Sequence, residues 1–241
     1  MNIRVKRVTA IAIVLLMPYL ASCKKTDEGV SLSEGDTLYG VTKEKEEKLE
    51  TKETTEYVEK FEEFEGYLKE DISNEDFEEN KYQKVNVLEK EGNKYLIENN
   101  TYSSCYVDSE KVEKLPESYI EVDISDQNLK LYNEGEEVLN TDVVTGKNST
   151  PTDLGYFSIA YKDYDVTLRG SNGDGTDYAS HVDYWMPFNG GEGFHDATWR
   201  DSFGGDIYEY DGSHGCVNMP YSEAEELYNN VETGTKVLIH K

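Results

Sequence analysis

The stretch SYIEVDISDQNLKLYNEGEEVLNTDVVTG, residues 118–146, places apolar side chains at alternating positions between two short turn-prone sequences. Alternation of this kind is the period of a β-strand with one buried face, and Asp, Asn and Gly in the intervening segments favour turns. The stretch therefore predicts a three-stranded antiparallel meander.

Further strand signals follow the meander to the end of the chain. They are LGYFSIAYK (154–162), DVTLRG (165–170) and TKVLIHK (235–241). The clearest helix signal is PYSEAEELYNN (220–230), which has Pro220 at its first turn and apolar side chains for packing. Residues 117–241 are therefore expected to form one mainly β domain with one or two short helices.

Residues 54–116 are expected to form a smaller α+β region. The apolar spacing of Tyr57, Phe61, Phe64 and Leu68 predicts a short amphipathic helix over 54–68. Residues 80–116 alternate apolar and polar side chains and predict a small antiparallel sheet, whose rhythm weakly resembles a bacterial SH3-like module. Cys105 falls in its last strand, as a half-buried small residue.

The N-terminus has the layout of an export signal, with Arg4, Lys6 and Arg7 before an apolar run. Leu20-Ala21-Ser22-Cys23 resembles a bacterial lipobox, which implies removal of residues 1–22 and lipidation of Cys23. A plain secretory signal or a short anchor is the alternative. Residues 23–53 are polar and predict a solvated tether. We expect an extracytoplasmic protein, lipid-anchored on the wall side of a bacterial membrane.

The formal net charge of −26 argues against nucleic acid as a partner, because phosphate backbones are bound through basic surfaces. The same charge is repelled by anionic membrane surfaces. Membrane attachment would therefore depend on the lipid.

The stretch DGSHGCVNMP (211–220) holds the residue with the most reactive side chain, Cys216. A cysteine there can be a nucleophile, a metal ligand or half of a disulfide with Cys105. As a nucleophile it needs a base, for which His214 and His195 are the candidates. The amides of Gly215 and Cys216 could stabilise an oxyanion, since glycine lets the backbone approach a carbonyl closely.

Metal binding is the weaker interpretation. Zinc could use Cys216 with His181, His195 and His214, but only the pair 214/216 has close spacing. The loop SNGDGTDYASHVD (171–183) lacks the glycine and glutamate of a calcium loop. We expect neither a metal nor any other cofactor.

His195, seventeen intervening residues, and Ser213-His214-Gly215-Cys216-Val217-Asn218 together resemble the signature of the YkuD-type L,D-transpeptidases. The segments VVTGKNSTPTDLGYFSI (143–159) and YWMPFNGGEGFHDATWRDSFGG (184–205) are similar to other parts of that family. The resemblance covers about residues 117–241. It implies a β-sandwich-like domain with the cysteine at the end of a long cleft.

The resemblance also implies roles for individual residues. Cys216 is the expected nucleophile and His195 its base, with one ring nitrogen toward the Cys216 sulfur and the other toward the backbone carbonyl of Asp196. Ser213 and His214 would shape the site, and Asn218 would steady the loop. The expected lid and cleft positions are Tyr184, Trp185, Trp199 and Arg200, of which Arg200 would pair with a stem-peptide carboxylate.

The activity implied by the resemblance is acyl transfer on peptidoglycan stem peptides. A tetrapeptide would be cleaved before its terminal D-alanine and joined through a Cys216 thioester to a neighbouring amine, which gives a 3→3 crosslink. Water as acceptor would make the protein an L,D-carboxypeptidase. A non-catalytic, lipid-anchored wall-binding protein is a further alternative, whereas a papain-like peptidase places its cysteine before its histidine. We expect the protein to act as a monomer.

Overall fold

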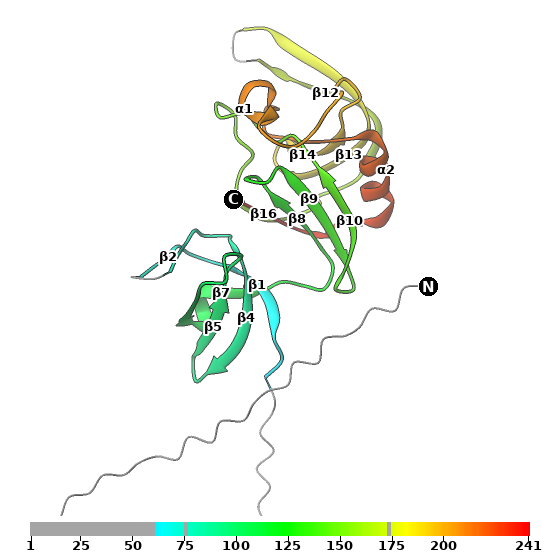
Figure 1. The fold of residues 1–241 in the computed structure, drawn as a ribbon. Helices are drawn as coiled ribbons and strands as arrows, with labels where there is room; N and C mark the ends of the chain where they lie inside the picture. Colours follow the sequence, from blue (N-terminus) through cyan, green and yellow to red (C-terminus); the bar gives the residue numbers. More distant parts are fainter. Residues whose placement is uncertain (1–60, 75–76, 173–174) are drawn as a thin grey trace, which may run out of the picture. The chain divides into compact units, whose positions relative to one another are not determined.

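The computed structural model describes residues 61–74, 77–172 and 175–241, and β-strands dominate them (Figure 1). The predicted export signal, Cys23, the tether and the start of the predicted helix lie outside the described residues. None of the helices in the described ranges is long and apolar enough to cross a membrane.

The first sheet is five-stranded, with strand order β6-β5-β4-β1-β7. Its strands are β1 (Phe64–Leu68), β4 (Lys84–Glu91), β5 (Lys94–Glu98), β6 (Ser104–Asp108) and β7 (Val112–Lys114). A turn of 3-10 helix (Ser109–Lys111) precedes β7, and β2 (Ile72–Ser73) pairs with β3 (Glu78–Glu79). The antiparallel sheet expected over 80–116 is confirmed, and its likeness to an SH3-like module stays a prediction.

The predicted helix over 54–68 is wrong where the structure describes it, because Phe64–Leu68 is strand β1. This strand pairs with both β4 and β7. A Cβ at Gly66 would lie 2.8 Å from the backbone oxygen of Glu113, so glycine permits the close pairing. Phe64 and Leu68 fit a period of two as well as a helical period, and the neighbouring strands select the extended form.

The second sheet contains the predicted meander and has strand order β10-β9-β8-β16-β11. Its strands are β8 (Tyr119–Asp123), β9 (Asn128–Asn133), β10 (Glu136–Asp142), β11 (Gly155–Ser158) and β16 (Lys236–His240). β8 and β9 pair antiparallel, as do β9 and β10, which confirms the meander. The C-terminal strand β16 lies parallel to β8.

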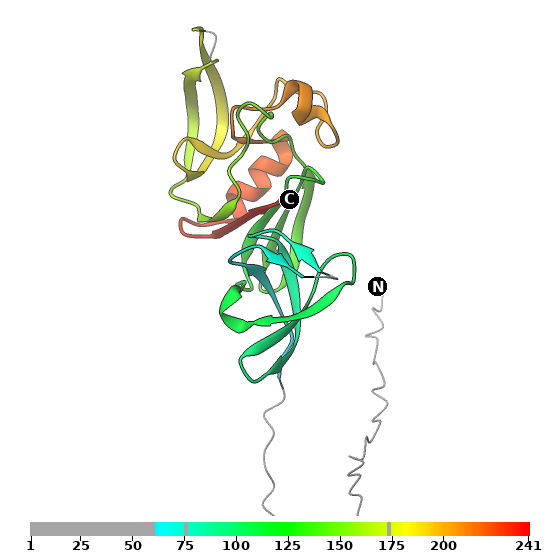
Figure 2. The same cartoon turned by 90° about the vertical axis from the view of Figure 1, so that its left-hand side faces the viewer.

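The third sheet carries the functional residues, in the order β12-β13-β14-β15. Its strands are β12 (Asp163–Ser171), β13 (Asp177–Asn189), β14 (Glu192–Asp196) and β15 (Val217–Met219). The β12–β13 hairpin extends beyond the neighbouring strands in both ribbon views (Figures 1 and 2). Helix α1 (Ile207–Asp211) precedes β15, and α2 (Tyr221–Asn230) follows it where a helix was predicted.

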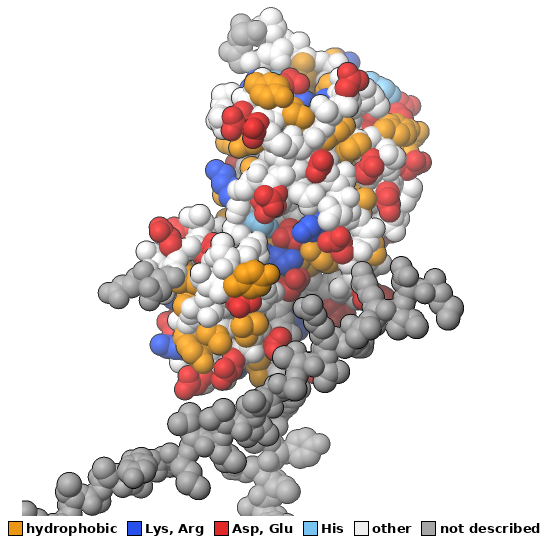
Figure 3. Space-filling view, viewed as in Figure 1, with side chains coloured by type: hydrophobic (Ala, Val, Ile, Leu, Met, Phe, Trp, Pro, Cys, Tyr) orange, Lys and Arg blue, Asp and Glu red, His pale blue; other side chains and the backbone are white. Residues whose placement is uncertain are grey.

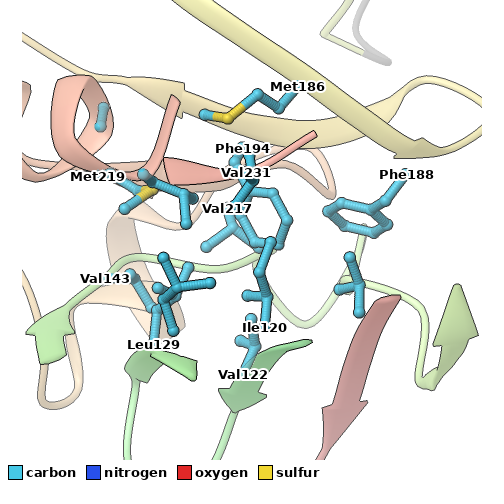
Figure 4. Packing of buried hydrophobic residues seen from close by; sticks show 14 of the residues in the cluster. Ile120, Val122, Leu129, Val143, Met186, Phe188, Phe194, Val217, Met219 and Val231 are labelled. Atoms are coloured by element: carbon cyan, nitrogen blue, oxygen red, sulfur yellow. The ribbon is translucent and has the colours of Figure 1, made fainter. Parts of the chain in front are cut away.

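The main core lies between the second and third sheets. Ile120, Val122 and Leu129 face Phe194 and Val217 across it (Figure 4). Burying such side chains is worth about 1.5–3 kcal/mol each. This arrangement shows the sandwich-like, mainly β domain expected for 117–241.

The alternation of side chains along β14 and β15 determines which residues face away from the core and form the candidate site. Phe194 and Val217 point into the core, so the next residues, His195 and Asn218, point to the opposite face. β14 and β15 run parallel, with His195 directly beside Asn218. Cys216 immediately precedes β15 and is therefore brought close to the same place. Acidic side chains are spread over the face of the molecule in Figure 3, in keeping with the net charge.

Candidate active site

His195 and Cys216 line one pocket of about 230 Å³. His214 and Asn218 share its walls, and the β12–β13 hairpin adds Tyr178. The parallel pairing of β14 with β15 thus unites a cysteine and a histidine that are distant in sequence. The sequence pattern predicted that Cys216 and His195 lie close together, and the pocket brings them together.

The ring of His195 is buried and held on both sides. Its Nδ1 lies 2.8 Å from the backbone oxygen of Asp196, which confirms the predicted contact. A carbonyl oxygen can only accept, so Nδ1 carries the proton. Nε2 lies 3.0 Å from Nδ2 of Asn218, which donates to it. Burial lowers the pKa of His195 below its ordinary value, so the ring is neutral near pH 7.

The other half of the prediction for His195 is wrong in the resting structure, because Nε2 meets Asn218 rather than the thiol. The register of β14 with β15 places the Asn218 amide directly against the ring. The thiol of Cys216 instead donates to the backbone oxygen of Gly191 at 3.5 Å.

The Cys216 thiol is neutral at rest. Burial raises its pKa to about 11, and the negative charge of Glu192 contributes, while the backbone N–H of Gly193 opposes the rise. A thiol is a weak nucleophile until it loses its proton. Activation of Cys216 therefore requires a base, and His195 is the neutral base in the same pocket.

His214 occupies a different position. It is exposed, and its ring stacks on Tyr178 with centroids 5.1 Å apart. It therefore links the turn that precedes β15 to the β12–β13 hairpin. This agrees with the predicted site-shaping role, and His195 is the better-placed candidate for the base.

Ser213 ties the turn before Cys216 together. Its hydroxyl donates to the backbone oxygen of Cys216 and accepts from the backbone N–H of Gly215 at 3.0 Å. The Gly215 amide, expected to face an oxyanion, is thus already bonded in the resting structure.

Two threonines of the segment 143–159 hold the same turn from outside. The Thr152 hydroxyl donates to the Gly215 oxygen at 2.8 Å, and the Thr150 hydroxyl donates to the Ser213 oxygen at 3.0 Å. Sequence reasoning gave these threonines no role, although the segment itself stood out as similar to the family.

Gly215 is required by its surroundings. Its φ is +117°, and a Cβ there would lie 2.7 Å from Oε1 of Glu192. We expect Gly215→Ala to displace Cys216 and to lower its rate of alkylation by iodoacetamide, with a stability loss of about 1–3 kcal/mol. The rate is measured by mass spectrometry and the stability by denaturant unfolding. Gly92→Ala is the matched control, since Gly92 also has positive φ but open space around its Cβ. Equal effects at both positions would contradict this account.

The residues expected in the lid and cleft divide into two groups. Trp199 is exposed and lines the pocket, and its ring centroid lies 5.8 Å from that of His195. Trp185 is buried, and its ring centroid lies 6.0 Å from that of His195. Tyr184 instead belongs to the core and packs on Tyr228. The cleft role expected for Tyr184 is therefore wrong, because its position on β13 points it inward.

Arg200 also differs from expectation. Its side chain is only 8 % exposed, donating from Nε to Oδ1 of Asn218 and from Nη1 to Oδ2 of Asp211, both at 2.9 Å. Its guanidinium is therefore already held by the protein.

The carboxylate of Asp196 has a structural role that sequence reasoning missed. Its Oδ1 accepts the backbone N–H groups of Asp183 and Tyr184 at 2.8 and 2.9 Å. These bonds fasten β14 to β13 and fix the carbonyl that orients His195.

Cys216 is not paired with Cys105 in a disulfide. Cys105 and Cys216 are both free thiols, and Cys105 is half-buried in β6, as predicted. Within the described ranges, no group of three His, Cys, Asp or Glu side chains is placed to hold a metal ion.

Glu192 is a second residue that sequence reasoning missed. Its carboxylate lies against Gly215 and contributes to the raised pKa of Cys216. We expect Glu192→Gln to speed alkylation of Cys216 several-fold at pH 8, because loss of the negative charge lowers the thiol pKa and increases the thiolate fraction. The rate is measured with iodoacetamide from pH 6 to 10. Glu137→Gln, an exposed change on β10, is the control. An unchanged or slower rate in Glu192→Gln would show that this charge does not act on the thiol.

A neutral histidine and a cysteine in one pocket of a β-sandwich supply the base and the nucleophile that cysteine-dependent acyl transfer requires. The family model of the YkuD L,D-transpeptidase catalytic domain matches residues 117–239. The chain belongs to this family.

Solved structures agree with this assignment. A mutant of the L,D-transpeptidase from Enterococcus faecium is 33% identical, with a TM-score of 0.52, covering 73% of this chain and 76% of the other. The Ldtfm–avibactam carbamoyl enzyme is 33% identical over 73% of this chain and 75% of the other, again with a TM-score of 0.52. The search of curated proteins gave no match.

Proposed function

We propose that the protein releases D-alanine from peptidoglycan stem tetrapeptides and forms 3→3 crosslinks through a thioester on Cys216. The observation that carries this proposal is the neutral His195, whose Nε2 is unprotonated in the pocket that also holds the Cys216 thiol. A base in this form can accept the thiol proton once substrate brings the two side chains together.

Acyl transfer takes place in two steps. Nε2 of His195 takes the thiol proton, and the Cys216 sulfur attacks the carbonyl of the third stem residue. The bond to D-alanine breaks, and the leaving amine takes the proton from His195. An acceptor amine then attacks the thioester and gives its proton to His195, which returns it to the departing sulfur. The mechanism requires no cofactor and uses groups of one chain only, so it can operate in a monomer.

Product analysis tests the proposal and separates it from hydrolysis. The full chain is incubated with disaccharide-tetrapeptide, and the muropeptides are identified by mass spectrometry. Crosslinked dimers that have lost D-alanine support transpeptidation. Tripeptide alone identifies an L,D-carboxypeptidase, and unchanged substrate would favour a non-catalytic wall-binding protein. Each result is compared with that of Cys216→Ala.

We further propose that Cys23 is lipidated and anchors the enzyme on the wall side of the bacterial membrane. We expect the protein expressed in bacteria to partition into the detergent phase, because an acyl chain contributes about 0.8 kcal/mol for each buried CH₂ group. Cys23→Ser should move it to the aqueous phase, whereas Cys105→Ser should have no effect. Equal partitioning of all three forms would contradict lipidation of Cys23 and would favour a plain secretory signal or an uncleaved anchor.

A further inference from the structure

Arg200 connects the catalytic histidine to the surface through a continuous chain of hydrogen bonds. Its Nη1 donates to Asp211, whose side chain is 71% exposed at the end of α1, and its Nε donates to Oδ1 of Asn218. Asn218 is buried and donates from Nδ2 to Nε2 of His195. The chain ends where Nδ1 of His195 donates to the backbone oxygen of Asp196.

Arg200 fixes which way the Asn218 amide faces. The guanidinium has only donors, so the group it meets must be the amide oxygen. Turning the amide over would place its NH₂ group against the N–H of Arg200 and would lose two hydrogen bonds, of which the one to His195 is buried. Since a buried polar group without a partner costs about 1–3 kcal/mol, the amide is held in the observed orientation.

The amide orientation in turn selects one form of His195. The ring meets a donor at Nε2 and an acceptor at Nδ1, a pattern that only the neutral ring protonated at Nδ1 satisfies. The nearby positive charge of Arg200 also disfavours a charged ring. Both effects keep Nε2 without a proton.

We propose that Arg200 is a positioning residue for acyl transfer, which acts through Asn218 to hold His195 in the neutral tautomer whose Nε2 receives the proton of Cys216. The inference rests on the proposed function in one respect, that His195 is the base. It replaces the substrate-carboxylate role suggested by the family resemblance.

The same arrangement favours release of the proton. Once Nε2 is protonated it can no longer accept from Asn218, so the charged ring loses a hydrogen bond. The ring regains that bond by giving the proton to the leaving amine. Arg200 and Asn218 therefore favour the neutral ring before and after each transfer.

The first test uses Arg200→Lys in the full chain. Lysine keeps the charge, but its single ammonium cannot reproduce the planar donors that reach Asn218 and Asp211. We measure the tautomer of His195 by ¹⁵N NMR and the alkylation of Cys216 by iodoacetamide, a neutral probe without a carboxylate. Asp201→Asn, at the exposed next residue, is the control.

The expected result is a wild-type His195 protonated only at Nδ1, and a mixture of tautomers in Arg200→Lys. Alkylation should fall by about two- to tenfold, in proportion to the fraction of His195 rings that leave the Nδ1-protonated tautomer, because only that form presents an unprotonated Nε2. The control should match the wild type. An unchanged tautomer and alkylation rate, with a higher KM for stem peptide, would overturn the proposal in favour of a substrate-carboxylate role.

Asn218→Asp supplies a second test that does not depend on the stability of Arg200→Lys. Aspartate is similar in shape but has no donor, so it accepts from His195 and should place a proton on Nε2. A ring still protonated only at Nδ1 would contradict the inference. The NMR and alkylation readouts do not use peptidoglycan, so a failure of transpeptidation with these two results intact would count against the proposed function alone.

Discussion

Replacing Cys216 with alanine should abolish release of D-alanine from a stem tetrapeptide, with a rate loss of about 10⁴- to 10⁶-fold. The loss is large because the thioester cannot form, so the remaining pocket only binds the substrate. The rate is measured by coupled detection of free D-alanine.

Cys105→Ala is the control for this experiment, because Cys105 is the other free thiol of the described residues and lies in β6. It should release D-alanine at the wild-type rate. Release of D-alanine by Cys216→Ala within about tenfold of the wild-type rate would mean that another residue attacks the substrate.

Replacing His195 with alanine should lower acyl transfer by roughly 10²- to 10⁴-fold, the usual contribution of a positioned base. The thiol pKa of about 11 makes this dependence strong, because little thiolate exists near pH 7 without proton transfer. The loss should appear both in D-alanine release and in alkylation by iodoacetamide. His181→Ala is the control, since that side chain is 60% exposed.

The comparison with His214→Ala decides which histidine is the base. His214 stacks on Tyr178, so its loss should reduce activity through the geometry of the loop and by less than the loss of His195. A larger loss for His214→Ala than for His195→Ala would reverse the assignment.

The pH profile gives an independent check on His195. Its pKa is lowered by burial, and the base acts in its neutral form. Activity should therefore persist at pH values below the ordinary titration range of histidine, and His195→Ala should remove this acid limb. An acid limb at the ordinary histidine value would show that the ring is not desolvated in the working enzyme.

The sequence predicted much of the catalytic domain because local signals and long-range packing agree there. Alternating residues over 118–146 became β8, β9 and β10, and Pro220 immediately precedes α2, where a helix was predicted. Over Phe64–Leu68 the local signal is ambiguous, because the apolar spacing suits a helix or a strand. Pairing with β4 and β7 selects the strand. No local pattern contains that information.

The sequence predicted which residues belong to the site, but fewer of the contacts between them. Motif spacing found Cys216 and His195, and the carbonyl of Asp196 has its predicted place. The contact between Asn218 and His195 depends on the parallel register of β14 with β15, and the bond from Arg200 crosses to another segment. Such partners follow from strand pairing in space, which the order of residues does not state.

The most direct test of the central claim is the mass of the acyl-enzyme. The full chain is mixed with a stem tetrapeptide in the absence of an acceptor amine, quenched in acid and analysed by intact-protein mass spectrometry with peptide mapping. The account predicts an added mass equal to the tetrapeptide less D-alanine, located on Cys216 and absent from Cys216→Ala. Release of D-alanine with no adduct, or an adduct on another residue, would contradict it.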